Sequence, residues 1–419
     1  SDPAQPETGD DLICTVAPGR VNLIGEHTDY TGGFVFPMAI GYSTVCVGQG
    51  SIVPKARAKC KVVSVNKQSP QSQVITFEAS KHMKPLPFDH SDSWTNYVAG
   101  VVDQYMAELP DDDHSISFQL AINGDVPLGS GLSSSAALEV AVATFIEKIM
   151  KDKYPDMKIG GGKEKALRCQ KAENVFCSSP CGIMDQYVSA TAASGSAILI
   201  DCRSLDYESI QMGETSQEGE AEKPVFLICN SNVKHSIGGG EYPVRVKQCA
   251  KATEVLQSIH GDDKIKSLRD ATVDDVEIAR KKVSDEGNIP LMDDLTYRRA
   301  KHVTTENERT QQAKIALTKG DWIQFGKLMN ESHESMKTDY EVSCDEIDIL
   351  VDLAQNFDGV YGSRLTGGGF GGCTVTLVER ARVSALCEHL KREYKAKTGG
   401  NECFTFVTSP GPGARELSI

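Results

Sequence analysis

Residues 127–139 read PLGSGLSSSAALE and connect two segments of opposite character. Residues 116–126 before them alternate apolar and polar side chains, which predicts a strand. Residues 133–150 begin within the quoted stretch. They are mostly apolar and predict a buried helix. A serine such as Ser133 can cap that helix, so that free backbone N–H groups at its positive end face outward. The stretch therefore predicts an anion site between a strand and a helix.

Serines and glycines are dense in this connection, which favours a bound ligand over a simple cap. The glycines let a phosphate approach the backbone, and the hydroxyls of Ser134 and Ser135 are candidates for binding phosphate or a metal. An ordinary capped helix is the alternative, but a cap needs one serine and not three. No G-K-[ST] follows, so the loop is not of the Walker A type.

A second polar stretch, APGRVNLIGEHTDY, lies at residues 17–30. Between its glycines it gathers four polar side chains: Arg20, Glu26, His27 and Asp29. Gly19 and Gly25 predict sharp turns of the backbone. Arg20 is a permanent planar cation that suits phosphate oxygens, and the carboxylates suit neighbouring hydroxyls of a sugar. A loop held together by its own ion pairs is the alternative.

Two further segments carry candidate groups. RLTGGGFGGC at residues 364–373 formally fits G-x-G-x-x-G, but the CTVTLV from its last residue onward predicts a strand, which argues against a dinucleotide fold. Its glycines predict either a tight hairpin or a close approach to the phosphate loop. SSPCGIMDQY at residues 178–187 places Asp185 in the first turn of a helix, whose dipole favours an ionised carboxylate. Glu173, on the preceding predicted helix, can turn toward the same place.

Length and charge limit the class of protein. The 419 residues predict two domains, and the net charge of −14 argues against binding to nucleic acid or to an anionic membrane. No apolar run of about 18 residues predicts a transmembrane helix. The polar N-terminal segment does not resemble a signal peptide. Thirteen cysteines without a regular framework indicate reduced thiols and a cytoplasmic protein.

Strands and helices are mixed along the chain rather than strictly alternating, which predicts an α+β fold. We expect two lobes, residues 1–210 and 211–419, and a solvated, mobile acidic segment at 214–222. The predicted strands span 13–17, 34–40, 43–48, 61–66, 73–78, 116–126, 197–201, 225–230, 374–378 and 403–408. The predicted helices span 94–109, 133–150, 163–176, 183–193, 242–259, 274–283, 295–319, 321–338, 344–356 and 382–397.

Together these motifs closely resemble the galactokinases, which belong to the superfamily named for galactokinase, homoserine kinase, mevalonate kinase and phosphomevalonate kinase. Residues 19–39 resemble the galactokinase signature, residues 127–139 the phosphate loop of the superfamily, and residues 365–373 its glycine-rich third motif. The resemblance extends from about Val16 over nearly the whole chain. It implies two lobes with the active site between them and the nucleotide mostly on the N-terminal lobe.

The resemblance also implies an activity, namely ATP-dependent phosphorylation of the C1 hydroxyl of α-D-galactose to galactose 1-phosphate, with Mg²⁺ as cofactor. It makes Asp185 the catalytic base and Arg20 the cation beside it. The implied sugar-binding positions are Glu26, His27, Asp29, Gly182, Asp185 and Tyr242. The implied ATP-binding positions are Gly129, Ser130, Gly131, Leu132, Ser133, Ser134 and Ser135. The implied metal positions are Ser135, with Ser134 beside it, and Glu173.

Two other functions remain open from the sequence. An N-acetylgalactosamine kinase of the same family usually departs from GEHTDYTGG after the histidine, so residues 28–33 favour galactose. A non-catalytic galactose and ATP sensor has an altered serine loop, whereas GLSSSAALE is intact here. The expected partners are galactose and ATP, without nucleic acid or membrane, and the expected state is a monomer or a weak homo-oligomer.

Overall fold

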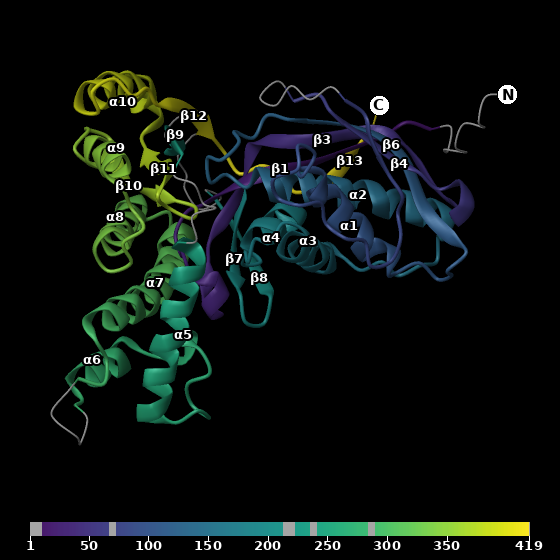
Figure 1. Ribbon diagram of the computed structural model, residues 1–419. Helices are drawn as coiled ribbons and strands as arrows, with labels where there is room; N and C mark the ends of the chain where they lie inside the picture. The colour runs from purple at the N-terminus through teal and green to yellow at the C-terminus, as the bar shows by residue number, and fades with distance from the viewer. Residues whose placement is uncertain (1–10, 67–72, 213–222, 235–240, 284–289, 419) are drawn as a thin grey trace.

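The computed structural model describes residues 11–66, 73–212, 223–234, 241–283 and 290–418. Figure 1 shows two lobes, one built on a long twisted sheet and the other on a smaller sheet flanked by long helices. Each lobe combines a largely antiparallel sheet with helices that pack against it. The predicted α+β class is therefore confirmed.

The first lobe is a sheet with helices packed against one face (Figure 1). Its strand order is β13-β1-β3-β6-β4-β5, antiparallel except where β4 lies beside β6. The strands are β1 (Ile13–Asn22), β3 (Pro37–Pro54), β4 (Cys60–Ser64), β5 (Ile75–Phe77), β6 (His114–Gly124) and β13 (Arg415–Leu417). The helices are α1 (Thr95–Met106), α2 (Ser134–Lys153), α3 (Gly162–Phe176) and α4 (Met184–Thr191). Phe118 and Phe145 meet edge to face in the core between sheet and helices.

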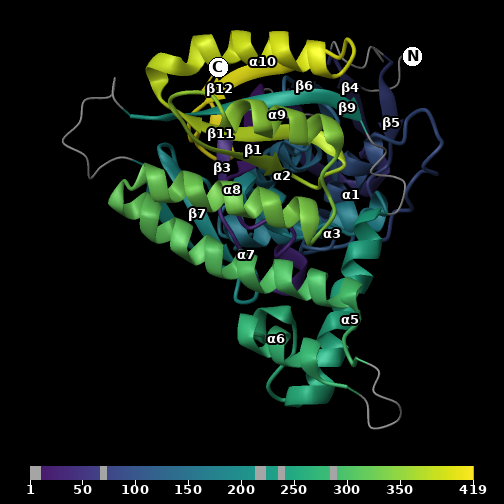
Figure 2. The same cartoon turned by 90° about the vertical axis from the view of Figure 1, so that its left-hand side faces the viewer.

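The second lobe holds an antiparallel sheet in the order β10-β11-β9-β12. Its strands are β9 (Val225–Lys234), β10 (Val360–Thr366), β11 (Gly371–Val378) and β12 (Phe404–Thr408). Its helices are α5 (Glu241–His260), α6 (Val273–Lys281), α7 (Asp294–Lys319), α8 (Trp322–Thr338), α9 (Asp345–Gln355) and α10 (Val383–Lys397). Figure 2 shows α8 and α7 stacked below the sheet, with α5 and α6 extending further from it.

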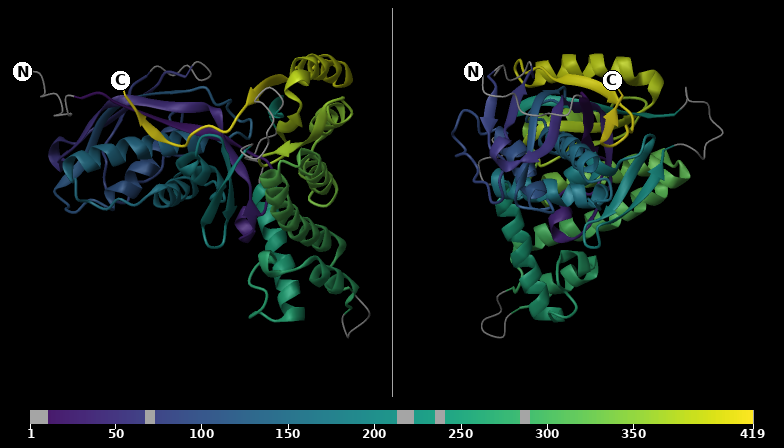
Figure 3. Two further views of the ribbon diagram at one scale, coloured as in Figure 1. Left: turned by 180° about the vertical axis from the view of Figure 1, so that it is seen from behind. Right: turned by 90° about the vertical axis from the view of Figure 1, so that its right-hand side faces the viewer.

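A short third sheet, in the order β2-β7-β8, lies where the lobes meet (Figure 3). Its strands are β2 (Phe34–Val35), β7 (Ser196–Asp201) and β8 (Asp206–Gln211). Short 3-10 turns complete the described elements: η1 (Asp29–Thr31), η2 (Lys55–Arg57), η4 (Leu268–Asp270) and η5 (Arg380–Arg382). Because η1 and β2 lie within residues 19–39 (the first motif), this sheet brings that motif to the junction of the lobes.

All predicted helices are present, and their ends fall within three residues of the predicted ends. The two separate strands predicted at 34–40 and 43–48 are wrong, because β3 runs unbroken from Pro37 to Pro54. β1 pairs with β3 at Ala39 and again at Ser43, and so carries β3 through Gly41, the glycine that suggested a break. Three strands were not predicted: β8, β10 and β13.

The predicted lobe boundary between residues 210 and 211 falls at the end of β8 and stays a prediction. β13, near the end of the chain, pairs with β1, so the last described strand returns to the sheet of the first lobe. The predicted acidic segment 214–222 lies outside the described residues.

Candidate active site

The phosphate loop and the first motif lie against each other through their backbones. The N–H of Arg20 donates to the carbonyl of Leu132 at 3.1 Å. A Cβ on Gly19 would stand 2.6 Å from that carbonyl, so Gly19 permits the close approach. Gly19 lies in β1 at a register shift, and the sharp turn predicted there is wrong. Gly25 does turn the chain, with φ at +94°.

Arg20 and Asp185 form the ion pair at the centre of the site. Nε of Arg20 donates to Oδ1 of Asp185 at 2.8 Å, and Nη2 lies 2.7 Å from the same oxygen. Nη1 donates to the carbonyl of Gly131 in the phosphate loop. The side chain of Arg20 is 6% exposed and that of Asp185 is 26% exposed. The carboxylate is therefore held on its buried side and remains open on the other.

Ser133 does not have the role that the sequence suggested. It precedes α2 in a left-handed conformation, with φ at 63°, and its side chain makes no capping hydrogen bond. The hydroxyl instead donates to Oδ2 of Asp185 at 2.6 Å. The capping prediction is wrong because this distant carboxylate takes the hydroxyl, and the phosphate loop is thereby connected to Asp185.

The glycine-rich third motif forms a hairpin and also approaches the phosphate loop, so both predictions for it are confirmed. It joins β10 to β11, which pair antiparallel from Thr366 and Cys373 outward. A Cβ on Gly367 would lie 2.9 Å from the carbonyl of Gly131, and one on Gly372 would lie 2.9 Å from a carbonyl of the same loop. Glycine is required here because both residues also have positive φ.

Asp29, Gly182 and Tyr242 come together beside Asp185. A Cβ on Gly182 would stand 1.6 Å from Oδ2 of Asp29, so only glycine leaves room for this carboxylate. Burial, and then the negative charge of Asp185, raise the pKa of Asp29 to about 7. Burial and then Asp29 raise the pKa of Tyr242 well above its usual value.

His27 lies among tyrosine rings at the same place. Its ring centroid is 5.7 Å from that of Tyr242 and 5.0 Å from that of Tyr340. Nδ1 is 3.1 Å from the hydroxyl of Tyr30, and Nε2 is 3.2 Å from the carbonyl of Gly368. Burial lowers the pKa of His27 to about 3, so the imidazole is neutral and serves as a hydrogen-bonding group.

Glu26 is less available than its neighbours in the motif. Its Oε1 accepts the N–H of Gly367 at 2.8 Å and the hydroxyl of Thr366 at 3.3 Å. Nη1 of Arg364 lies 3.6 Å from the same oxygen. Glu26 therefore connects the first motif to the third, and its contact with a sugar stays a prediction.

Glu173 and Ser135 form the pair of candidate metal positions. The hydroxyl of Ser135 donates to the carboxylate of Glu173, and Nε2 of Gln186 donates to Oε2 of Glu173 at 2.6 Å. Burial and then Asp185 raise the pKa of Glu173 to about 7. Glu139 lies beside it, with Oε1 buried and unpartnered, and burial followed by Glu173 raises the pKa of Glu139 well above its usual value. No ion pair among the described residues involves Glu173 or Glu139, and the oxygen chemistry of these groups fits a hard ion such as Mg²⁺.

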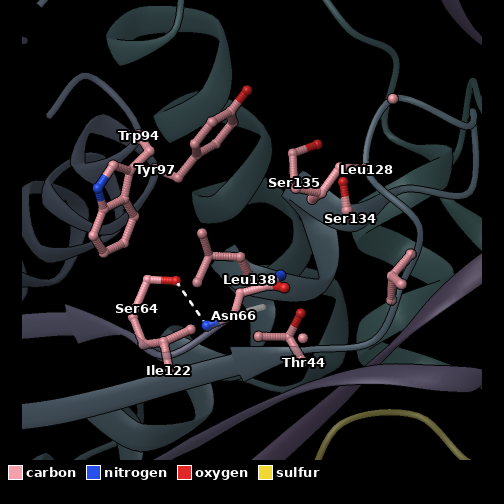
Figure 4. A pocket seen from close by; sticks show the side chains of 13 residues that line it. Thr44, Ser64, Asn66, Trp94, Tyr97, Ile122, Leu128, Ser134, Ser135 and Leu138 are labelled. Carbon is pink, nitrogen blue, oxygen red and sulfur yellow. Dashed lines mark hydrogen bonds between the residues drawn. The ribbon is translucent and has the colours of Figure 1, made fainter. Parts of the chain in front are cut away.

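A cavity of about 270 Å³ opens directly beside the phosphate loop (Figure 4). Its lining includes Ser134 and Ser135, and its opposite wall carries the rings of Trp94 and Tyr97. An aromatic wall next to anion-binding serines suits a purine nucleotide. The motifs did not indicate this aromatic wall. The rest of the lining comes from several elements and includes Thr44, Ser64, Asn66, Ile122, Leu128 and Leu138. Trp94 and Tyr97 lie in the helix predicted at 94–109, and no local motif marks them as ligand-binding residues.

None of the helices in the described ranges has both the length and the apolar character needed to cross a membrane. Within the same ranges, no three His, Cys, Asp or Glu side chains gather into a ready cation site.

Family comparisons match both lobes. The galactokinase galactose-binding signature matches residues 6–49, the GHMP kinase N-terminal domain residues 96–193, and the GHMP kinase C-terminal domain residues 313–396. The galactokinase of Canis lupus familiaris is 42% identical over 415 residues, which cover 99% of this chain and 93% of that protein. The galactokinase of Homo sapiens is 40% identical over 417 residues, covering 99% and 94%. The chain belongs to the galactokinase family.

Solved structures agree with membership of the galactokinase family. Galactokinase from Lactococcus lactis, solved with galactose, superposes with a TM-score of 0.82 at 31% identity, covering 97% of this chain and 96% of that one. Mevalonate kinase from Methanococcus jannaschii superposes with a TM-score of 0.61 at 17% identity, covering 96% and 99%, which shows the shared fold alone. This galactokinase-family chain is therefore a kinase of the GHMP fold.

Proposed function

We propose that the protein transfers the γ-phosphoryl group of ATP to the C1 hydroxyl of α-D-galactose, giving galactose 1-phosphate and ADP. The observation that carries the proposal is the position of Asp185. Its carboxylate accepts hydrogen bonds from Arg20 and from Ser133 of the phosphate loop, and its charge acts on Asp29, which lies against Gly182. One open carboxylate thus lies between a candidate nucleotide site and a candidate sugar site.

In the proposed reaction Asp185 accepts the proton of the C1 hydroxyl as that oxygen bonds to phosphorus. A carboxylate is a weak base toward an alcohol, so the proton moves late, when the bond to phosphorus is forming. Arg20 orients the carboxylate through two of its nitrogens and places positive charge next to the phosphate loop. Phosphoryl transfer depends mainly on such positioning and charge neutralisation.

On the sugar side we assign the hydroxyl contacts to Glu26, His27, Asp29, Tyr242 and the backbone at Gly182. Asp29 is a half-buried carboxylate that forms no salt bridge with the described residues, so sugar hydroxyls can complete its hydrogen bonds. A sugar hydroxyl at His27 would share a ring nitrogen with Tyr30 or Gly368. On the nucleotide side we assign the phosphates to residues 129–135 and the base to the cavity with Trp94 and Tyr97.

Ser135 and Glu173 are the residues that would hold Mg²⁺. Mg²⁺ keeps several waters and needs only one or two protein carboxylates, which agrees with a single hydroxyl–carboxylate pair here. When bound with ATP, the ion neutralises charge on the phosphates. A hydrogen bond from Gln186 also holds the carboxylate of Glu173 in place.

Several further properties stay proposals beside the activity. All thirteen cysteines, which lie within the described ranges, are free, and this supports a reducing compartment such as the cytoplasm. A monomer or weak homo-oligomer, and the lobe limits 1–210 and 211–419, are retained as predicted. The relatives reported above are named galactokinases, which favours galactose over N-acetylgalactosamine and an enzyme over a sensor.

ADP release tests the proposal directly. Purified protein is given ATP and Mg²⁺ with galactose, N-acetylgalactosamine, glucose or no sugar, in parallel with EDTA in place of Mg²⁺. Turnover with galactose alone, abolished by EDTA, is expected. Turnover with N-acetylgalactosamine instead would identify the sister kinase. Binding of galactose and ATP without turnover would identify a sensor.

A further inference from the structure

One side of helix α7 holds the loop that carries His27 and Asp29. His302, Glu306 and Asn307 are buried. His302 and Glu306 are four residues apart and share one face of α7, and Asn307 lies next to Glu306 further around the helix. The purple segment that follows β1 lies beside this helix in Figure 1 and again in Figure 3. None of the three α7 residues belongs to the motifs that indicated the active site.

Glu306 binds the start of the loop. Its Oε1 accepts the N–H of Gly25 at 2.9 Å and the N–H of Glu26 at 3.3 Å. The same oxygen accepts the hydroxyl of Ser332 at 2.6 Å, and Oε2 accepts Nε of Arg309 at 2.8 Å. The side chain of Glu306 is 0% exposed, so these hydrogen bonds are shielded from water.

The charge of Glu306 is fixed at neutral pH. Burial by itself would raise the pKa of Glu306, but the positive charge of Arg309, followed by His302 and Arg364, lowers it to about 2. A buried anion aimed at two adjacent backbone N–H groups binds them more strongly than a neutral acceptor does.

Asn307 and His302 bind other parts of the same loop. Oδ1 of Asn307 accepts the N–H of Phe34 at 2.9 Å, where the loop enters β2. Nε2 of His302 lies 3.1 Å from the carbonyl of Glu26, and burial lowers the pKa of His302 to about 4, so the ring is neutral. The helix thus holds both ends of a loop whose middle carries His27 and Asp29.

The loop needs such support because its backbone is unusual. Gly25 has φ at +94° and His27 has φ at 61°, in the left-handed region that a histidine adopts rarely. Such conformations persist only where the surroundings impose them. If the ends of the loop were not held, the imidazole of His27 and the carboxylate of Asp29 would no longer have fixed orientations.

We propose that Glu306 and Asn307 are positioning residues for the sugar: by binding both ends of loop 25–34, α7 sets the affinity for galactose without touching it. The inference rests on the proposed function, since it assumes that this loop binds galactose. The nucleotide cavity is lined by residues between Thr44 and Leu138, away from α7. Loss of the hydrogen bonds from Glu306 and Asn307 to loop 25–34 should therefore weaken galactose binding and leave ATP binding unchanged.

The experiment compares Glu306→Ala with Glu306→Gln and with Glu308→Ala. Glu308 is exposed on the same helix, so its variant is a matched control for loss of charge. We expect Glu306→Ala to raise the KM and the calorimetric Kd for galactose roughly 10- to 100-fold, because small misplacements of binding groups cost this much. The KM for ATP should stay within about twofold. Glu306→Gln keeps an acceptor oxygen for Gly25 and should recover most of the affinity.

Asn307→Ala serves as the second variant if Glu306→Ala fails to fold, since it removes only the acceptor for Phe34. It should show the same selective rise in the KM for galactose. Equal effects on galactose and ATP, or values like those of Glu308→Ala, would overturn this positioning role while leaving galactose phosphorylation by the wild type intact. Failure of the wild type to bind galactose would overturn both proposals.

Discussion

Replacing Asp185 by asparagine tests the centre of the proposed mechanism. Asparagine has the shape of aspartate and keeps one carbonyl oxygen for Arg20, while the hydroxyl of Ser133 can rotate to accept from the new amide. The variant therefore loses only the negative charge and the site that accepts the proton. A general base contributes about 10²- to 10⁴-fold to the rate. We expect kcat to fall by that factor, equivalent to about 3–5 kcal/mol in the barrier.

The stability of this variant should change much less than its activity. Removing one partner of a fully buried ion pair costs about 3–5 kcal/mol. Asp185 is 26% exposed, however, so water can partly replace it beside Arg20, and about 1–2 kcal/mol is expected. The protein should stay folded and should still bind ATP.

The assay measures kcat for ADP release at saturating galactose and Mg·ATP, with thermal unfolding followed on the same samples. Asp206→Asn, the same change at an exposed position of β8, is the control. A kcat for Asp185→Asn within about tenfold of wild type, or about 1.4 kcal/mol, would refute the role of Asp185 as the essential base.

Two other predictions concern the sugar site. In Gly182→Ala, the added methyl would stand 1.6 Å from Oδ2 of Asp29, so calorimetry should show galactose binding weakened by about 100-fold with ADP binding retained. An unchanged Kd for galactose would contradict the proximity of the two residues. Asp29→Asn tests the pKa of Asp29, which is raised to about 7. A carboxyl whose pKa is raised on folding stabilises the protein when protonated, and this contribution fades as the pH rises from about 4 through 7. Asparagine does not titrate, so the stability of the variant relative to wild type should increase between pH 5 and pH 8, by about 2 kcal/mol for this half-buried group. An equal difference at both pH values in thermal unfolding without sugar would contradict the raised pKa.

Local sequence determined the helices of this protein well. A mostly apolar run produced α2 at nearly its predicted position, because the apolar character of a buried helix depends on residues close in sequence. The motifs were equally informative, since glycines and charged groups concentrated in short stretches pointed to Arg20, the serine loop and Asp185. These stretches meet at one place, where Arg20 contacts both Asp185 and the carbonyl of Gly131.

Strand limits depended instead on partners that are distant in sequence. β13 is three exposed residues that become a strand only because β1 offers an open edge, and β3 continues through Gly41 because β1 pairs with it on both sides of that residue. The stabilisation that a strand gains from pairing with a distant neighbour cannot be predicted from the residues of that strand alone.

The sequence by itself determined the polar groups of the site that lie in motifs, because glycines, serines, Arg20 and the carboxylates each stand within a short stretch of the chain. Only the tertiary structure decided what each group contacts. Ser133 gives its hydroxyl to Asp185 and not to its own helix, and Glu26 turns to the third motif. The aromatic wall of the nucleotide cavity and the α7 contacts to loop 25–34 were likewise absent from every motif. The reason is physical: hydrogen bonds and burial act over a few ångströms in space, and folding brings together atoms hundreds of residues apart in the chain.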